Sequence, residues 1–296
     1  MKKILAIIAL TLILVSVTVF AENETITYDF ENIMSENPDD LPQGITVENG
    51  FHNSIWLGKY STTCTLGLPV TFKFENLSLS GYGAVSFGLL SQYFDEDSTL
   101  EVTSVTESGK EFTESIPLTS TNAEFYTLKL PETDEKITSF NIFVNSITED
   151  KSMFDVELEF LKFHKGSSVM LLSTKEALAI HDGEKIVPQS PAVIRDGSTL
   201  TPARFVAERF GANVEWIAEE RKVVITKGDT KIELVIDSKT ALVNGEQKEL
   251  AYPACIIDNY TYTPARFVAE NLGCTVDWDA QTKMVFITSS FAEKKK

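Results

Sequence analysis

The chain has 296 residues, 43% of them apolar, which is enough for one to three domains with hydrophobic cores. Its 43 acidic residues outnumber its 26 basic residues, and the net charge is −17. Because such a surface repels phosphate groups, we expect neither nucleic acids nor anionic lipid headgroups among its partners. Three cysteines are too few for a disulfide-based scaffold.

Residues 1–21 have the pattern of a secretory signal peptide. Lys2 and Lys3 form a basic start, an apolar run extends from Ile4 to Phe20, and Ala21 is a small residue before a cleavage point. The run of about 17 residues lies at the lower limit for crossing a bilayer, so an uncleaved anchor is the alternative. We expect cleavage after Ala21 and a secreted or cell-surface protein.

Residues 22–165 contain strand-like segments that are separated by clusters of glycine, proline and aspartate. Phe154, Val156, Leu158 and Phe160 alternate with polar residues, and Ser108-Gly109 is typical of a hairpin tip. About eight or nine such segments predict an antiparallel β-sandwich, jelly-roll-like, and no long helix. A linker is expected at residues 166–170.

Four aromatic residues of this region lie in glycine-rich or polar segments, where some would be exposed: Trp56, Tyr60, Tyr82 and Tyr93. Flat aromatic faces suit sugar rings, so these residues are candidate carbohydrate-binding residues. The alternative is that they are core or rim aromatics.

A structural calcium ion is the one cofactor that the sequence suggests. Asp29 and Glu31 near the first strand could meet Asp155 near the last strand and supply oxygen ligands. The acidic run from Asp95 to Asp97 is a rival site. A solvated acidic surface without metal is the alternative for both.

The last part of the chain contains an internal repeat. The segment TLTPARFVAERFGANVEW begins at Thr199, and TYTPARFVAENLGCTVDW begins at Thr261, 62 residues later. The similarity continues without a gap over about 180–226 and 242–288. A period of this size indicates duplication of one supersecondary unit.

Each unit has the pattern of a hairpin, a short helix and a second hairpin. Asp182-Gly183 and Asn244-Gly245 are tight-turn dipeptides. Thr201 and Thr263, each before a proline, are expected to cap the helices. Since one two-turn helix is unstable alone in water, the units should share one α+β domain at 171–291, followed by a basic tail at 292–296.

Five structural anchors recur in each unit: Pro202, Arg204, Phe205, Gly211 and Trp216, and then Pro264, Arg266, Phe267, Gly273 and Trp278. Each arginine precedes a glutamate by four residues, which predicts an exposed ion pair, with a ligand contact as the alternative. Each glycine suits a left-handed helix end. The tryptophans alternate with valines and are expected to face the core, with a sugar platform as the alternative.

Cys255 and Cys274 lie within the second unit, and their pairing remains open. They replace Val193 and Ala212 of the first unit. Replacement of such residues favours small buried side chains over a disulfide.

The two repeated segments resemble the stalk domain of exported proteins of Gram-positive bacteria, also described as copper amine oxidase N-terminal-like. The resemblance covers roughly 120 of the 296 residues. It implies a small α+β module on secreted or surface-attached proteins, without catalysis. In copper amine oxidases the metal belongs to a separate domain, and the histidines here, His52, His164 and His181, are scattered, so we expect neither copper nor amine oxidase activity.

The preceding sandwich resembles carbohydrate-binding modules in its architecture. The sequence contains no nucleophile elbow, zinc-protease motif, phosphate loop or dinucleotide fingerprint. We therefore expect an exported non-catalytic protein whose sandwich binds polysaccharide or a cell-wall component. The alternatives are an enzyme or enzyme subunit with a carboxylate pair in the sandwich, and a structural envelope protein that binds another protein.

Mature protein from the medium or the envelope should begin at Glu22, because signal peptidase cuts after a small residue such as Ala21. N-terminal sequencing of the exported protein measures this. Full-length protein found in the cytoplasm would contradict the prediction.

Overall fold

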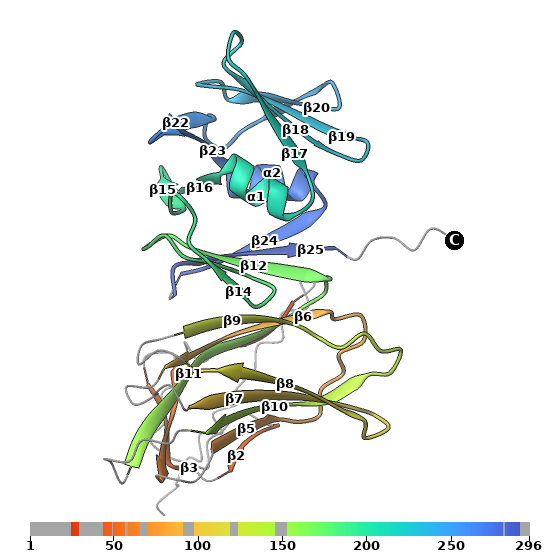
Figure 1. Ribbon diagram of the computed structural model, residues 1–296, viewed down its shortest axis with the longest axis vertical. Coiled ribbons are helices and arrows are strands. Elements are labelled where there is room, and N and C mark those ends of the chain that lie inside the picture. Colours follow the sequence, from red (N-terminus) through yellow and green to blue (C-terminus); the bar gives the residue numbers. More distant parts are fainter. Residues whose placement is uncertain are drawn as a thin grey trace, which may run out of the picture.

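A computed structural model describes residues 25–29, 44–48, 50–56, 59–65, 70–90, 98–118, 124–145, 153–280 and 282–290. The predicted signal peptide and the basic tail lie outside these residues. The described chain forms an antiparallel β-sandwich and a small α+β domain stacked on one end of it (Figure 1), which confirms the predicted fold class. No helix in these ranges is long and apolar enough to span a membrane.

The sandwich consists of two sheets, which we name after their central strands. The β11 sheet has the order β3 (Gly50–Trp56), β4 (Lys59–Thr65), β11 (Met153–His164), β6 (Ala84–Leu90) and β9 (Glu124–Lys129), and β1 (Thr25–Asp29) also pairs with β11. The β10 sheet has the order β2 (Ile45–Glu48), β5 (Val70–Phe74), β10 (Ile137–Asn145), β7 (Thr99–Thr106) and β8 (Glu111–Pro117). The turn at Ser108-Gly109 joins β7 to β8, as predicted.

Alternating apolar residues of both sheets fill the sandwich core, among them Phe72, Phe87 and Phe140, which are fully buried. A β-bulge interrupts the alternation in β11. Leu158 lies opposite Leu89 and Phe160 lies opposite Gly88, so Glu159 is an extra residue. The predicted alternation through Phe160 is therefore wrong at its end, because the bulge moves Leu161 and Phe163 into the core and Phe160 out of it.

The second domain repeats one series of elements twice. The first unit contains β12 (Ser168–Ser173), β13 (Ala179–His181), β14 (Glu184–Ile186), β15 (Val193–Arg195), β16 (Ser198–Pro202), α1 (Ala203–Arg209), β17 (Asn213–Ile217) and β18 (Lys222–Lys227). The second unit contains β19 (Thr230–Val235), β20 (Thr240–Val243), β21 (Glu246–Glu249), β22 (Cys255–Ile257), β23 (Tyr260–Pro264), α2 (Ala265–Asn271), β24 (Cys274–Asp279) and β25 (Met284–Ser289).

The two units exchange strands. The β12 sheet, ordered β14-β13-β12-β25-β24, takes three strands from the first unit and two from the second, and the β19 sheet, ordered β17-β18-β19-β20-β21, does the reverse. In the four-stranded β16 sheet, Thr201 pairs with its repeat equivalent Thr263. This pairing places an approximate twofold axis between the units. Each unit therefore lacks two strands of a sheet until the other supplies them.

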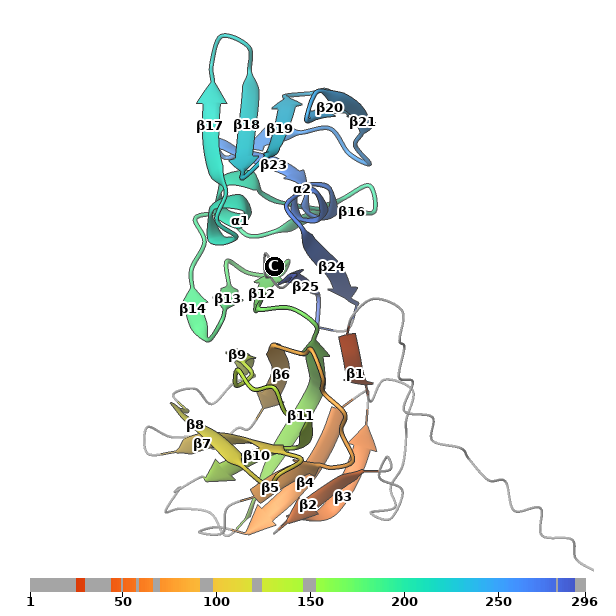
Figure 2. The ribbon, with the colours of Figure 1, turned by 90° about the vertical axis from the view of Figure 1, so that its right-hand side faces the viewer.

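The helices α1 and α2 lie side by side between the β19 sheet and the β12 sheet (Figures 1 and 2). Their C-terminal ends follow the prediction, since Gly211 and Gly273 adopt φ angles of 78° and 81°. Their N-terminal ends do not. Pro202 and Pro264 occupy the N-cap positions without a side-chain hydrogen bond, because the two threonines belong to the β16–β23 ladder.

The predicted ion pairs on the helices are confirmed: Arg204 contacts Glu208 at 2.9 Å, and Arg266 contacts Glu270 at 3.2 Å. The expectation for the tryptophans holds only for Trp278, which packs against a core. Trp216 is 40% exposed, although it has the equivalent position in β17, which like β24 is an edge strand. Phe205 and Phe267 are half-buried at the rims of the two cores.

The connection between the domains is shorter than the expected linker at 166–170, because β12 begins at Ser168. On the far side of the bulge, β11 turns three side chains toward the β12 sheet. Phe160 packs edge-on against Phe286, the Lys162 ammonium group contacts Asp277 at 3.5 Å and Asp279 at 3.1 Å, and His164 hydrogen-bonds Ser86 and Thr288. The two domains thus share a buried contact, which we call the joint.

Leu234→Ala should destabilise both units together, because Leu234 is fully buried in a core that both units and both helices build. We expect a loss of about 2–5 kcal/mol in the free energy of unfolding, against less than about 1 kcal/mol for the control Val235→Ala at the next, 42% exposed position. Urea denaturation measures the loss. Faster amide exchange in the strands of the second unit alone, with those of the first unit unchanged, would show that the units are independent.

Acid should weaken the fold through His164. Burial, and secondarily the charge of Lys162, lowers the pKa of His164 from 6.5 to about 3. Below pH 6.5 the unfolded chain therefore binds a proton that the folded chain does not, and stability falls as the pH falls. At pH 5 this amounts to about 2 kcal/mol, which His164→Gln should remove from the pH dependence of unfolding. An unchanged pH dependence in that variant would contradict the assignment.

Candidate binding face of the sandwich

The outer face of the β10 sheet is built of two cross-strand rows. Strand register places one row across all five strands, formed by Thr46, Lys73, Asn141, Thr103 and Thr113. The neighbouring row is formed by Glu48, Thr71, Phe143, Glu101 and Ser115. We call these ten residues the polar face. Nine of them carry hydroxyl, amide or charged groups.

The local sequence explains why these side chains point outward. In β10, Phe140, Ile142 and Val144 are buried, so the intervening Asn141 and Phe143 lie on the opposite side of the strand. The same alternation in β5 and in Thr99–Thr103 of β7 buries the apolar residues and leaves threonine, lysine and glutamate outside. The residues of the polar face are half-buried or exposed.

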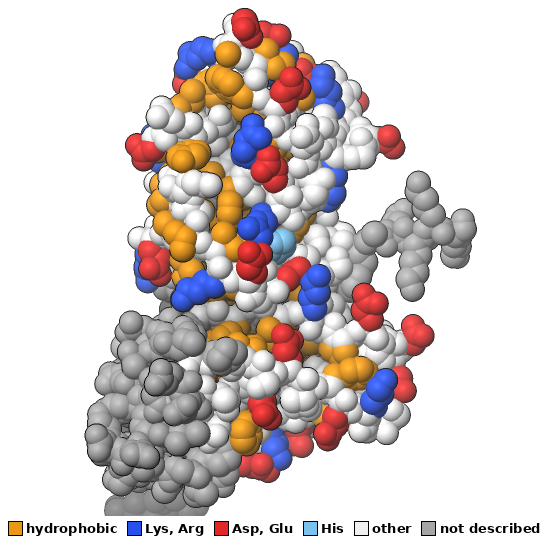
Figure 3. Space-filling model, in the orientation of Figure 1, with side chains coloured by type: hydrophobic (Ala, Val, Ile, Leu, Met, Phe, Trp, Pro, Cys, Tyr) orange, Lys and Arg blue, Asp and Glu red, His pale blue; other side chains and the backbone are white. Residues whose placement is uncertain are grey.

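Contacts within the polar face fix several of its side chains. The Lys73 ammonium group pairs with Glu48, and the hydroxyl groups of Thr103 and Thr113 lie 2.9 Å apart. Phe143 is the one aromatic residue of the face, with Thr71 and Glu101 as its cross-strand neighbours. In Figure 3, uncharged polar side chains and backbone atoms dominate the visible surface of the described part of the sandwich, among scattered acidic and basic groups. The face can therefore offer many hydrogen bonds and one flat apolar surface.

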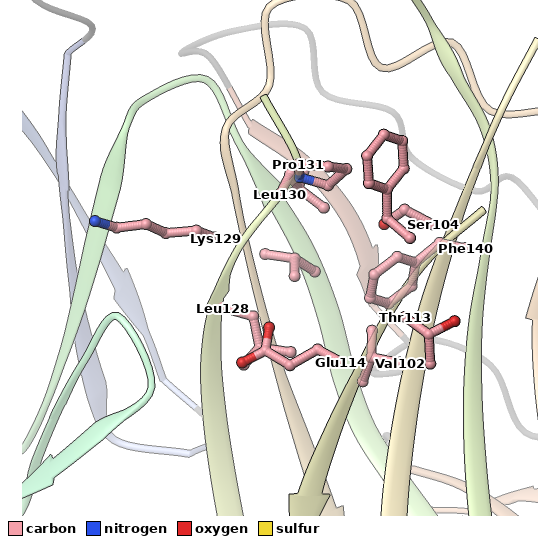
Figure 4. Close-up of a pocket in the computed structure, with 11 residues that line it drawn as sticks. Val102, Ser104, Thr113, Glu114, Leu128, Lys129, Leu130, Pro131 and Phe140 are labelled. Carbon is pink, nitrogen blue, oxygen red and sulfur yellow. The ribbon is translucent and has the colours of Figure 1, made fainter. Parts of the chain in front are cut away.

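A cleft opens where the edge strands β8 and β9 leave the sandwich uncovered (Figure 4). It holds about 180 Å³ and is lined mainly by apolar side chains, including Val102, Leu128 and Phe140. Lys129 points away from it, toward Asp182 at 3.3 Å, and Glu114 contributes a carboxylate. Since small-molecule sites usually have roughly 300–1,000 Å³, the cleft suits a single small group.

One Ser-His-Asp group occurs in the described residues, where the tip of the β13–β14 hairpin meets the first residue of β12. Ser168 Oγ lies 2.8 Å from His181 Nε2 and donates to Asp182 Oδ2, also at 2.8 Å. In a catalytic triad the carboxylate instead accepts from the ring nitrogen opposite the serine. Asp182 also accepts a bond from the backbone N–H of Val169, and burial lowers the pKa of His181. This arrangement fastens the hairpin and does not activate the serine.

The four predicted carbohydrate-binding residues do not lie on the polar face in the parts that the structure describes. Trp56 and Tyr60 belong to the edge hairpin β3–β4, where Trp56 pairs with Lys59, and their side chains lie outside the described atoms, as does Tyr93 entirely. Tyr82 is half-buried against the sandwich core, and the Lys165 ammonium group lies 5.5 Å from its ring centre. Tyr82 therefore sits beside the joint.

The backbone places two of the three proposed calcium ligands, Asp29 and Asp155, far apart. Asp29 lies opposite Phe160, five positions along β11 from Asp155, which corresponds to roughly 16 Å. The side chains of both aspartates, and Glu31 and Asp95 to Asp97, lie outside the described residues. Within the described part, no group of three histidine, cysteine, aspartate or glutamate residues is placed to hold a metal ion.

The two cysteines of the second domain are not joined by a disulfide bond. Cys255 is half-buried, and Cys274 is buried in the core beneath α2. Burial raises the pKa of Cys274 to about 11, so its thiol stays protonated and unreactive at neutral pH.

Residues 164–287 match the copper amine oxidase N-terminal domain family, which confirms the resemblance seen in the repeats. Solved structures similar to the chain include an agarase, at 11% identity and a TM-score of 0.37, covering 48% of this chain and 25% of the agarase. They also include variants of the carbohydrate-binding module CBM29-2. One shares 14% identity, covers 48% of this chain and 92% of the module, and has a TM-score of 0.33.

Another variant, solved with cellulohexaose, shares 16% identity, covers 48% of this chain and 93% of the module, and has a TM-score of 0.34. The chain thus spans about a quarter of the agarase and nearly all of the modules. No curated protein matches it.

Proposed function

We propose that the chain is an exported, non-catalytic protein whose sandwich binds polysaccharide on the polar face and whose second domain serves as the stalk. The observation that carries the proposal is the polar face itself. It combines outward hydroxyl, amide and charged groups in two rows with one half-buried phenylalanine in the middle of the second row.

The chemistry of the face matches that of a sugar chain. Sugar hydroxyl groups both donate and accept hydrogen bonds, as do the threonine, serine and asparagine side chains of the two rows. The apolar C–H face of a sugar ring can stack on Phe143. Because sugars are strongly hydrated, an open face gains little net energy per contact, and affinities in the micromolar to millimolar range follow.

The overall charge narrows the ligand class. A net charge of −17 disfavours acidic polysaccharides, whereas the mixed charges of Glu48, Lys73 and Glu101 within the face tolerate neutral chains. We therefore propose a neutral polysaccharide or a neutral stretch of a cell-wall polymer as the ligand. The cleft between β8 and β9 is too small to hold a chain and is not needed for this binding.

A protein partner in the envelope is the second candidate function. Six large hydrophobic residues are exposed in the described chain, and all lie in the second domain: Val187, Ile194, Trp216, Val235, Ile256 and Tyr260. Ile194 and Ile256 occupy equivalent positions of the two units. Figure 3 shows apolar side chains gathered along one side of this domain. Exposed apolar surface of this kind suits contact with another protein.

Phe143→Ala should abolish retention of the protein on an immobilised neutral polysaccharide without a change in melting temperature, because the ring is half-exposed and outside the core. Affinity electrophoresis against a panel of glycans and cell-wall fractions measures the retention. Trp216→Ala, which removes an exposed aromatic ring from the second domain, is the control and should bind like the unmodified protein.

Trp56→Ala tests the alternative binding site on the β3–β4 hairpin in the same experiment. Loss of binding in this variant, with Phe143→Ala unaffected, would move the site to the β3–β4 hairpin. If the unmodified protein ignores every glycan tested, the polysaccharide proposal fails and the protein-partner function replaces it.

A further inference from the structure

We propose that the face of the β12 sheet at the joint is a dedicated docking surface, which locks the sandwich and the second domain into one rigid body that unfolds in a single transition. The proposal concerns the orientation of the two domains and does not depend on the ligand. It rests on a difference between the β12 and β19 sheets, on the groups buried in the joint, and on the tight connection.

The duplication supplies an internal comparison. The β12 and β19 sheets are equivalent, and three positions that face the sandwich in the β12 sheet carry charged residues in the β19 sheet. Val169, Leu171 and Met284 in the first correspond to Lys231, Glu233 and Lys222 in the second, 62 residues apart. The apolar set is buried in a cluster with Phe160 and Ala84 of the sandwich.

The charged set forms surface ion pairs instead. Lys222 contacts Glu220 at 2.6 Å and Glu233 at 3.3 Å, and Lys231 contacts Glu233 at 2.8 Å. Elsewhere the two cores use equivalent residues, so the fold of the units does not demand an apolar residue at these positions. Contact with the sandwich is what distinguishes them.

Polar groups fix how the two surfaces meet. Lys162 is 5% exposed, and its ammonium group lies 4.3 Å from the ring centre of Phe286 as well as beside the two aspartates. A buried charge that loses its partners is strongly destabilising. Separation of the two domains must therefore expose Lys162 to water. The Thr127 hydroxyl accepts from the backbone N–H of Gly183, and Lys129 pairs with Asp182, at the other side of the joint.

The segment that connects the two domains is short and is held by the second domain. The backbone N–H of Ser167 donates to the Ser289 carbonyl oxygen, and a Cβ atom on Gly166 would lie 2.1 Å from that same oxygen. Residues 165–167 are therefore tied to the last strand of the second domain. A connection held in this way transmits orientation, whereas a flexible linker would not.

Figures 1 and 2 show what the docking does to the sandwich. The second domain covers the end of the β11 sheet near β6 and β9, and the β10 sheet lies on the far side of the sandwich from that contact. The stalk would thereby hold the polar face at a fixed angle and keep it uncovered.

The test exchanges residues between the two sheets. Leu171→Glu with Met284→Lys places Glu233 and Lys222 of the β19 sheet at the equivalent positions of the docking surface. In the full chain, this double variant should show two calorimetric transitions instead of one. Trypsin should also cut after Lys165, whose side chain is exposed, at least about tenfold faster, because the opened connection becomes accessible.

A second pair of variants decides the matter if the double variant does not fold. Lys162→Met removes the buried charge of the joint. The control, Lys222→Met, removes a lysine of the β19 sheet that also contacts two carboxylates but does not face the sandwich. Only Lys162→Met should accelerate cleavage after Lys165. Two transitions or rapid cleavage in the unmodified protein would overturn the proposal, as would equal protection in Lys162→Met and Lys222→Met.

Discussion

The bulge at Glu159 is the constraint on which the arrangement of the two domains depends. It inserts one residue into β11 and reverses the direction of every side chain that follows. Before the bulge, Val156 and Leu158 face the sandwich core, and after it Leu161 and Phe163 take over that role. Phe160, Lys162 and His164 are thereby released to the other side, where they meet the second domain. Without the bulge, a lysine and a histidine would point into the core of the sandwich.

The second domain depends on a related principle, which is that neither unit is complete by itself. Each short helix has an apolar side too small to form a core, and each five-stranded sheet needs two strands from the other unit. Pairing of Thr201 with Thr263 sets the two units about one axis. The sequence then breaks this symmetry at one surface, which is apolar on the β12 sheet and charged on the β19 sheet. The symmetric interior gives stability, and the asymmetric surface gives attachment to the sandwich.

Local patterns were sufficient to predict the elements and insufficient to predict how they assemble. Turn dipeptides, the helix periodicity and the glycine after each helix identified the repeated unit, because each signal acts over a few residues. Strand exchange between units was not predictable, since a hairpin such as β17–β18 has the same pattern whichever sheet it joins. The bulge was also missed, because Glu159 continues an alternating series and only the register with β6 shows the extra residue.

The candidate site illustrates the same limit. A search for aromatic residues in loop-like segments selected Trp56 and Tyr60 and passed over Phe143, which lies in the middle of a strand. Its alternation with Ile142 and Val144 already indicated an outward position, but only the sheet order shows that threonine and glutamate flank it. The most direct measurement is a titration of the isotopically labelled protein with a neutral polysaccharide, followed by backbone amide chemical shifts. We predict shifts concentrated in β5, β10 and β7 around Phe143, with the β3–β4 hairpin and the second domain unchanged. Shifts concentrated in the β3–β4 hairpin, or none in the β10 sheet, would contradict the assignment of the polar face.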